Sequence, residues 1–80
     1  MNTPTREELR TLLTALLLCG STFTDEEWQA AVKMANGGRF PAALMFNRFY
    51  YASFKKGLLG FDDHCNCCVT EAGRRYVLEQ

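Results

Sequence analysis

The residues best suited to chemistry cluster in one short run, 62–68, which holds two aspartates, one histidine and three cysteines. Thiolate and imidazole groups are the ligands that zinc prefers, but structural zinc sites usually take them from two separated pairs. Here Cys67 and Cys68 are adjacent, so a strand would turn them to opposite faces. We therefore expect no metal site, and we expect one of these two thiols to pack in the core as a small hydrophobe. The alternative, metal binding or redox sensing, would depend on His64, Cys65, Cys67 and Cys68.

The fourth cysteine, Cys19, ends an apolar run that begins at Leu12, and we expect it to pack in the core as well. A catalytic thiol needs a base held within hydrogen-bond reach. His64 is the only histidine, and it falls on a predicted turn. A turn would not hold a cysteine and this histidine in a fixed orientation. The chain also has no glycine-rich phosphate loop and no metalloprotease motif. The sequence therefore predicts no catalytic residues, no cofactor and no enzymatic activity.

The length and charge of the chain exclude several classes of protein. Eighty residues form one small domain, residues 1–80, which is too short for a large cofactor-binding architecture. Nine basic and nine acidic residues give zero net charge, whereas non-specific nucleic-acid coat proteins and basic membrane-surface peptides need a surplus of Lys and Arg. A hydrophobic fraction of 48% with 22% charged residues excludes a chain that is disordered by composition.

The cysteine spacing favours a reducing, cytoplasmic environment. Disulfide-stapled secreted domains spread their cysteines along the chain, whereas three of the four cysteines here lie within four positions. The apolar run that ends at Cys19 is about eight residues long, far short of the roughly 20 that span a bilayer. It follows Glu7 and Glu8, where an export signal needs positive charge. We therefore expect no membrane segment and no membrane partner.

The first two predicted helices each begin at a capping box, in which a threonine hydroxyl and a glutamate three residues later satisfy free backbone N–H groups. Thr5 and Glu8 begin the first helix, whose leucines follow the i, i+3, i+4, i+7 spacing of one buried face and which Gly20 ends. Thr24 and Glu27 begin the second helix, and the Asn-Gly-Gly run after it is a stop signal. Its buried face is predicted to be Trp28, Ala31, Val32 and Ala35.

A third helix is predicted from Pro41 to about Lys56, because proline suits the first helical turn and Gly57 follows as a stop. This helix carries more large apolar side chains than one face can bury, so some of them must face solvent or a partner.

After the third helix the pattern changes to that of a hairpin. Residues 58–61 predict a strand, residues 62–66 a turn and residues 67–69 a returning strand. Thr70 then caps a last helix that runs to about Leu78, although Gly73 weakens it slightly. The predicted fold class is therefore mainly α with a small β-hairpin.

Two segments of the second half follow one another across the hairpin: Lys55-Lys56-Gly57-Leu58-Leu59 and Val69-Thr70-Glu71-Ala72-Gly73-Arg74-Arg75. This order resembles the winged helix-turn-helix family, in which a recognition helix ends in a charged pair, a glycine and two aliphatic residues. A wing hairpin and a threonine-capped helix then follow. The resemblance covers about residues 6–79 and is strongest over residues 54–77. It implies three helices, a wing hairpin and a C-terminal helix.

The resemblance puts the third helix in the recognition position and implies a small regulator that binds double-stranded DNA. A homodimer is expected, because one short module with few basic residues reads few base pairs. Asn47 and Arg48 would contact bases, since amide and guanidinium groups pair with base edges. The implied phosphate contacts are Arg39, Lys55, Lys56, Arg74 and Arg75.

The distribution of charge along the chain is also compatible with a protein partner. The start of the third helix, residues 42–46, has no base-reading side chain, and the predicted turn carries Asp62 and Asp63, which repel phosphate. Residues 1–38 hold three basic and five acidic residues, a net charge of −2, and residues 39–80 hold six and four, a net charge of +2. This weak polarity permits DNA contact without requiring it.

The alternative function is a non-enzymatic protein-binding module. Exposed aromatic and methionine side chains beside an arginine are typical of interface hot spots, and the candidates here are Met45, Tyr50 and Tyr51. Very short, net-neutral domains of this kind are similar to phage and mobile-element proteins, among which are inhibitors of host proteins such as anti-CRISPR proteins. The predicted partner is therefore either double-stranded DNA or a protein.

Overall fold

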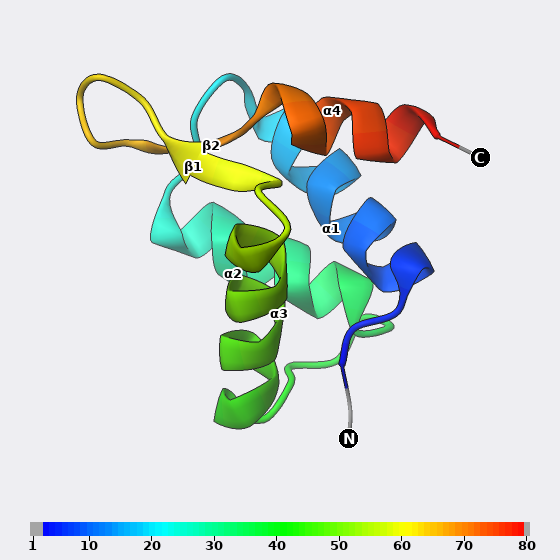
Figure 1. Ribbon diagram of the computed structural model, residues 1–80. Coiled ribbons are helices and arrows are strands. Elements are labelled where there is room, and N and C mark those ends of the chain that lie inside the picture. The colour runs from blue at the N-terminus through cyan, green and yellow to red at the C-terminus, as the bar shows by residue number, and fades with distance from the viewer. Residues whose placement is uncertain (1–2, 80) are drawn as a thin grey trace.

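The computed structural model describes residues 3–79, which form four helices and one two-stranded antiparallel hairpin (Figure 1). The elements in chain order are α1 (Arg6–Cys19), α2 (Asp25–Ala35), α3 (Ala43–Lys55), β1 (Leu59–Phe61), β2 (Cys67–Val69) and α4 (Glu71–Leu78). The predicted class, mainly α with a small β-hairpin, is therefore confirmed.

Both predicted capping boxes are present. At the start of α1, Glu8 N–H donates to Thr5 Oγ1 over 3.1 Å, while Thr5 N–H donates to Glu8 Oε1 over 2.8 Å. Thr24 and Glu27 exchange the same two bonds at the start of α2, over 3.2 and 2.8 Å. Because these bonds satisfy N–H groups that have no partner inside a helix, the local sequence fixes where α1 and α2 begin.

Helix α1 supplies the leucines at the centre of the core, and it packs against both α2 and α4. Its buried residues are Leu9, Leu12, Leu13 and Leu16. The other buried apolar residues come from every remaining element except α4: Phe23, Ala31, Val32, Ala35, Phe49, Ala52, Leu58, Leu59 and Val69. Trp28, predicted for the buried face of α2, is only half-buried, since its ring lies at the edge of the core between Phe23 and Tyr50.

Helix α3 begins later than predicted. Pro41 lies in the preceding loop rather than in the first turn, and Ala42 is the N-cap residue, without a side-chain cap. The helix buries only Phe49, Ala52 and Ser53. In Figure 1, α3 crosses α2 and runs up to the hairpin. Met45, Phe46 and Phe54 are half-buried against the core, so only the outward side of α3 remains available to a partner.

The hairpin leads into α4 through Thr70. The two strands pair with Leu59 opposite Val69, Gly60 opposite Cys68 and Phe61 opposite Cys67. Thr70 Oγ1 accepts a hydrogen bond from Gly73 N–H at 3.1 Å, which is the predicted cap of α4, and donates one to Gly57 O at 2.6 Å. One hydroxyl therefore ties α4 to the turn that leaves α3, where Gly57 adopts a φ of +72°.

Gly73 has a packing role that the sequence did not indicate. It is buried against the hairpin, and a Cβ atom at this position would meet the carbonyl oxygen of Leu58 and lie 2.6 Å from Val69 Cγ1. The prediction that this glycine weakens α4 is based on helix propensity, which does not include packing against the hairpin. The absence of a side chain lets the backbone of α4 lie directly against the hairpin.

Candidate nucleic-acid interface on helix α3

The buried residues of α3 determine which of its side chains point outwards. Phe49, Ala52 and Ser53 face the core, so the opposite side of the helix faces solvent. Asn47 and Tyr51 lie one turn apart in the middle of this outward side, and 65% of Tyr51 is exposed. An amide and a phenol are therefore the groups that an approaching partner meets first.

A groove of about 800 Å³ lies between this side of α3 and the segment that precedes α1. Thr3 and the buried Pro4 form one wall of it. We call this feature the α3 groove, and the residues that α3 and its C-terminal end contribute to it are Asn47, Arg48, Tyr51, Ala52, Lys55 and Lys56. Three of these are cations, and no carboxylate is among the described residues that line the groove.

One cation of the α3 groove, Lys55, contacts another side chain of the same helix. Lys55 lies in the last turn of α3, where the helix dipole favours positive charge. Its Nζ atom lies 5.6 Å from the centroid of the Tyr51 ring, within the range of a cation–π contact. The Tyr51 ring therefore orients the ammonium group beside the groove without neutralising its charge.

The structure brings together four of the seven predicted DNA contacts, namely Asn47, Arg48, Lys55 and Lys56. Arg39 lies outside the α3 groove, in the loop between α2 and α3, where its carbonyl oxygen accepts a hydrogen bond from Asn36 Nδ2 at 3.1 Å.

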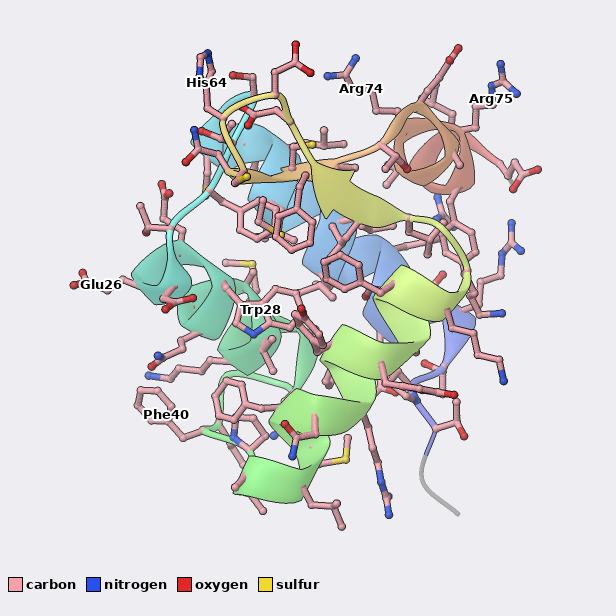
Figure 2. All side chains as sticks on the ribbon, turned by 60° about the vertical axis from the view of Figure 1, so that its left-hand side comes forward. Glu26, Trp28, Phe40, His64, Arg74 and Arg75 are labelled. Atoms are coloured by element: carbon pink, nitrogen blue, oxygen red, sulfur yellow. The ribbon has the colours of Figure 1, made fainter. Side chains whose placement is uncertain are left out.

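The other two predicted contacts, Arg74 and Arg75, are exposed on α4, which packs against α1 and β2 (Figure 2). Arg75 forms an ion pair with Glu71 at 3.0 Å. These two arginines therefore form a basic group separate from the α3 groove.

The three predicted protein-contact residues do not share one surface. Tyr50 and Tyr51 are exposed, whereas Met45 is half-buried and packs against the core. Tyr51 lines the α3 groove, but the Tyr50 ring lies 4.5 Å from the ring of Phe54 on the other flank of α3. Helix α3 therefore has a basic flank and an aromatic flank.

The hairpin turn is held by its own aspartate. Asp62 Oδ1 accepts hydrogen bonds from the backbone N–H groups of His64 and Asn66, both at 2.9 Å, and Cys65 has a φ of +64°. The side chains of His64 and Cys65 are exposed. Within residues 3–79, no group of three or more His, Cys, Asp or Glu side chains is placed to hold a metal ion.

The cysteines of the hairpin and of α1 differ in their surroundings. Cys67 is half-buried and packs against the core, in line with the expectation for one of the adjacent pair. Burial, and then the neighbouring Cys68, raises the pKa of the Cys67 thiol. The prediction that Cys19 packs in the core is wrong: it is exposed, because the buried face of α1 stops at Leu16 and the chain leaves the helix at Gly20.

The sequence analysis also missed two residues that the fold places beside the basic and aromatic flanks of α3. Pro4 precedes the first capping box and carries no binding signal of its own, because its burial depends on where α3 packs. Phe61 is 60% exposed on β1 and was not singled out. Strand alternation could not have found it, since it places Phe61 on the same face of β1 as the buried Leu59.

Comparison of the chain with models of protein families, with curated proteins and with solved structures finds no match. None of the helices within residues 3–79 has the length and apolar character needed to cross a membrane. The α3 groove itself combines cations, an amide and a phenol, which are groups that proteins use to contact phosphates and base edges.

Proposed function

We propose that this chain is a small DNA-binding domain of the winged helix-turn-helix kind, which lays α3 in the major groove of double-stranded DNA. The observation that carries this proposal is the α3 groove, where three cations and Asn47 line one flank of one helix and none of the lining residues within 3–79 is a carboxylate. The order of three helices, a hairpin and a last helix supports the same assignment.

The groove residues divide into two roles. Asn47 and Arg48 contact bases, since an asparagine amide pairs with adenine and a guanidinium with guanine in the major groove. Lys55 and Lys56, at the far end of α3, contact phosphates, and the hydroxyl of Tyr51 donates to the backbone between them. The cations outside the groove would add outer phosphate contacts on a longer duplex, and these are Arg39, Arg74 and Arg75.

The hairpin turn contributes less to DNA binding than α3 does in this arrangement. Asp62 is engaged by the backbone of the turn, and Asp63 is exposed beside it. Because these carboxylates repel phosphate, the DNA lies towards the α3 groove and away from the turn.

The charge of the groove sets the expected affinity. Each neutralised phosphate contributes about −0.9 to the slope of log K against log salt concentration, so the two lysines that contact phosphates give a slope of about −2 for one protomer. Binding this dependent on phosphate falls at about 10⁻⁴ to 10⁻⁶ M at physiological salt. A homodimer would bind more tightly and read two half-sites about 34 Å apart.

Fluorescence anisotropy of a labelled mixed-sequence duplex, measured over a salt series, tests the proposal. We expect binding at low salt that weakens as salt is added. The double variant Lys55→Gln/Lys56→Gln should reduce the magnitude of the salt slope by about 2, because each lysine accounts for about one phosphate contact.

Lys33→Gln is the matched control. Lys33 also carries one positive charge, but it lies on α2, outside the α3 groove, with its Nζ atom 4.4 Å from the centroid of the Phe40 ring. This variant should bind as the wild type does. Absence of duplex binding at low salt, or an equal loss per charge from Lys33→Gln, would exclude the α3 groove as the DNA-binding site.

A further inference from the structure

Five aromatic rings form a continuous row on the flank of α3 that faces α2 and the hairpin. The row begins with Phe23 and Trp28, whose ring centroids lie 6.2 Å apart, and Trp28 meets Tyr50 edge to face at 6.1 Å. Tyr50 lies 4.5 Å from Phe54, and Phe54 lies 5.5 Å from Phe61. We call these five residues the aromatic row. Figure 2 shows Trp28 between α2 and α3, below the hairpin.

The aromatic row is open to solvent. Phe61 and Tyr50 are 60% and 49% exposed, and Trp28 and Phe54 are half-buried. The rings surround a hollow of about 210 Å³, whose other walls include Asp25, Leu59 and Cys67. An apolar cavity of about 150 Å³ is large enough to hold benzene, so this hollow has room for one large apolar side chain.

The rim of the hollow is acidic. Asp25 lines it, whereas Glu26 projects away from Trp28 on the other side of α2 (Figure 2). Asp63 is exposed in the hairpin turn, two residues after Phe61. In the part of the chain that the structure describes, no lysine or arginine lines the hollow. Because burial raises the pKa of the Cys67 thiol, this side chain stays neutral at pH 7 and adds no charge to the wall.

We infer that the hollow of the aromatic row docks a protein segment that inserts one large apolar side chain and places a lysine or arginine beside it. The rings and Leu59 provide an anchor pocket of the kind that carries most of the energy of a protein interface. Asp25 supplies the complementary charge for a cation next to that anchor.

The charge of the rim argues against two other occupants. A nucleic acid would bring phosphates against Asp25 without a cation among the described lining residues to balance it. A second copy of this chain, docked through the same face, would bring identical carboxylates together, since a two-fold contact pairs each patch with itself.

Trp28 makes the inference directly testable, because it is the only tryptophan of the chain and lines the hollow. The probe is a tryptophan-free helical peptide of about 15 residues built from Leu and Lys, long enough to form a marginal helix. The comparison peptide carries Glu in place of every Lys. We expect the Lys peptide to change the Trp28 emission saturably, and the Glu peptide to bind about tenfold more weakly or less, because it repels the rim.

Two exposed phenylalanines supply matched variants. Phe61→Thr removes the outermost ring of the aromatic row but keeps a residue that favours strands, and it should weaken the Lys peptide about tenfold. Phe40→Ser removes a ring that is 70% exposed in the loop between α2 and α3, outside the row, and it should leave binding unchanged. Tyr50→Gln repeats the test from the helical side of the row, where no strand pairing is disturbed, and circular dichroism checks that each variant is folded.

Three results would overturn the inference. The first is an equal Trp28 response to the Lys and Glu peptides, and the second is an equal loss from Phe40→Ser and Phe61→Thr. The third is a dimer of the free protein, seen by sedimentation, that Phe61→Thr dissociates, because the row would then be a contact between copies of this chain. None of these measurements uses DNA, so their outcome is independent of the function proposed for the α3 groove.

Discussion

Replacement of Gly73 by alanine should destabilise this protein, although the same change in the middle of an exposed helix stabilises by about 1 kcal/mol. Gly73 lies in α4 and is buried against the hairpin. An added Cβ atom would meet the carbonyl oxygen of Leu58 and lie 2.6 Å from Val69 Cγ1. The carbonyl belongs to the backbone, so the overlap is relieved only if α4 and the hairpin move apart.

The magnitude follows from two opposing effects. Overpacking of a well-packed site costs about 1–3 kcal/mol, and at this site the cost lies at the upper end. The reason is that Leu58 O also accepts the hydrogen bond of Thr70 N–H, at 3.0 Å, which any shift of the strand would strain. The gain in helix propensity offsets about 1 kcal/mol, so we expect a net loss of about 2 kcal/mol. For a domain of this size that loss lowers the Tm by roughly 8–16 °C.

Thermal unfolding followed by circular dichroism, with urea unfolding as a second measurement, gives the change. Gly60→Ala is the control, because its added Cβ atom would lie 3.1 Å from Thr70 Cγ2, a side-chain methyl, with no backbone atom within 4 Å. We expect the control to lose less than about 1 kcal/mol. A Gly73→Ala protein as stable as the wild type, or more stable, would refute the close approach of α4 to the hairpin.

Substitutions at three further positions test other parts of the molecule. Ser53→Ala should leave the free energy of unfolding unchanged or raise it by up to about 1 kcal/mol in urea unfolding, because the Ser53 hydroxyl is buried without a hydrogen-bond partner among the described residues. Thr70→Val should lower it by about 1–2 kcal/mol, because the variant loses both the cap to Gly73 and the bond to Gly57, and Thr70→Ser should restore most of the loss. The backbone N–H of Thr24 holds the pKa of Glu27 below its ordinary value, so Glu27 stabilises the fold above its unfolded-state pKa and loses this contribution as the pH falls through its folded-state pKa. Glu27→Gln should therefore flatten the fall in Tm over that acidic range, measured by thermal unfolding at a series of pH values.

Each of these three expectations has a contrary result. A clear loss of stability in Ser53→Ala would mean that the hydroxyl has a partner, such as a bound water. Full stability in Thr70→Val would show that the two hydroxyl bonds contribute nothing, and failure of Thr70→Ser to recover stability would show that the hydroxyl alone is not sufficient. An unchanged acid profile in Glu27→Gln would show that the capping carboxylate contributes no pH dependence.

The sequence located the elements because their signals are local. Thr5, Thr24 and Thr70 accept hydrogen bonds from N–H groups only three residues away, so their role is visible in the sequence itself. The start of α3 was misplaced because Pro41 suits both the first turn of a helix and the loop before it. Helix α3 also lacks a capping side chain, so no second local signal corrected the boundary.

The surface features of α3 depend on tertiary packing, which periodicity alone does not give. Four predicted DNA contacts share the α3 groove because they lie on one flank of one helix, which helical spacing can predict. The opposite wall, with Pro4, and the aromatic row, which joins Phe23 to Phe61, require elements that are distant in the chain. The exposure of Cys19 also depends on tertiary packing, since an apolar pattern does not show at which residue the other elements stop packing against α1.

The central claim is that DNA binds the basic flank of α3 and leaves the aromatic flank free. The most direct measurement is a titration of the isotope-labelled protein with a short duplex at low salt, followed by the NMR amide shifts and the indole N–H signal of Trp28. We predict that the amide signals of Asn47, Tyr51 and Lys55 move together with added duplex, while the Trp28 indole signal stays in place. Movement of the Trp28 indole without movement of the groove amides, or no movement of any signal, would contradict it.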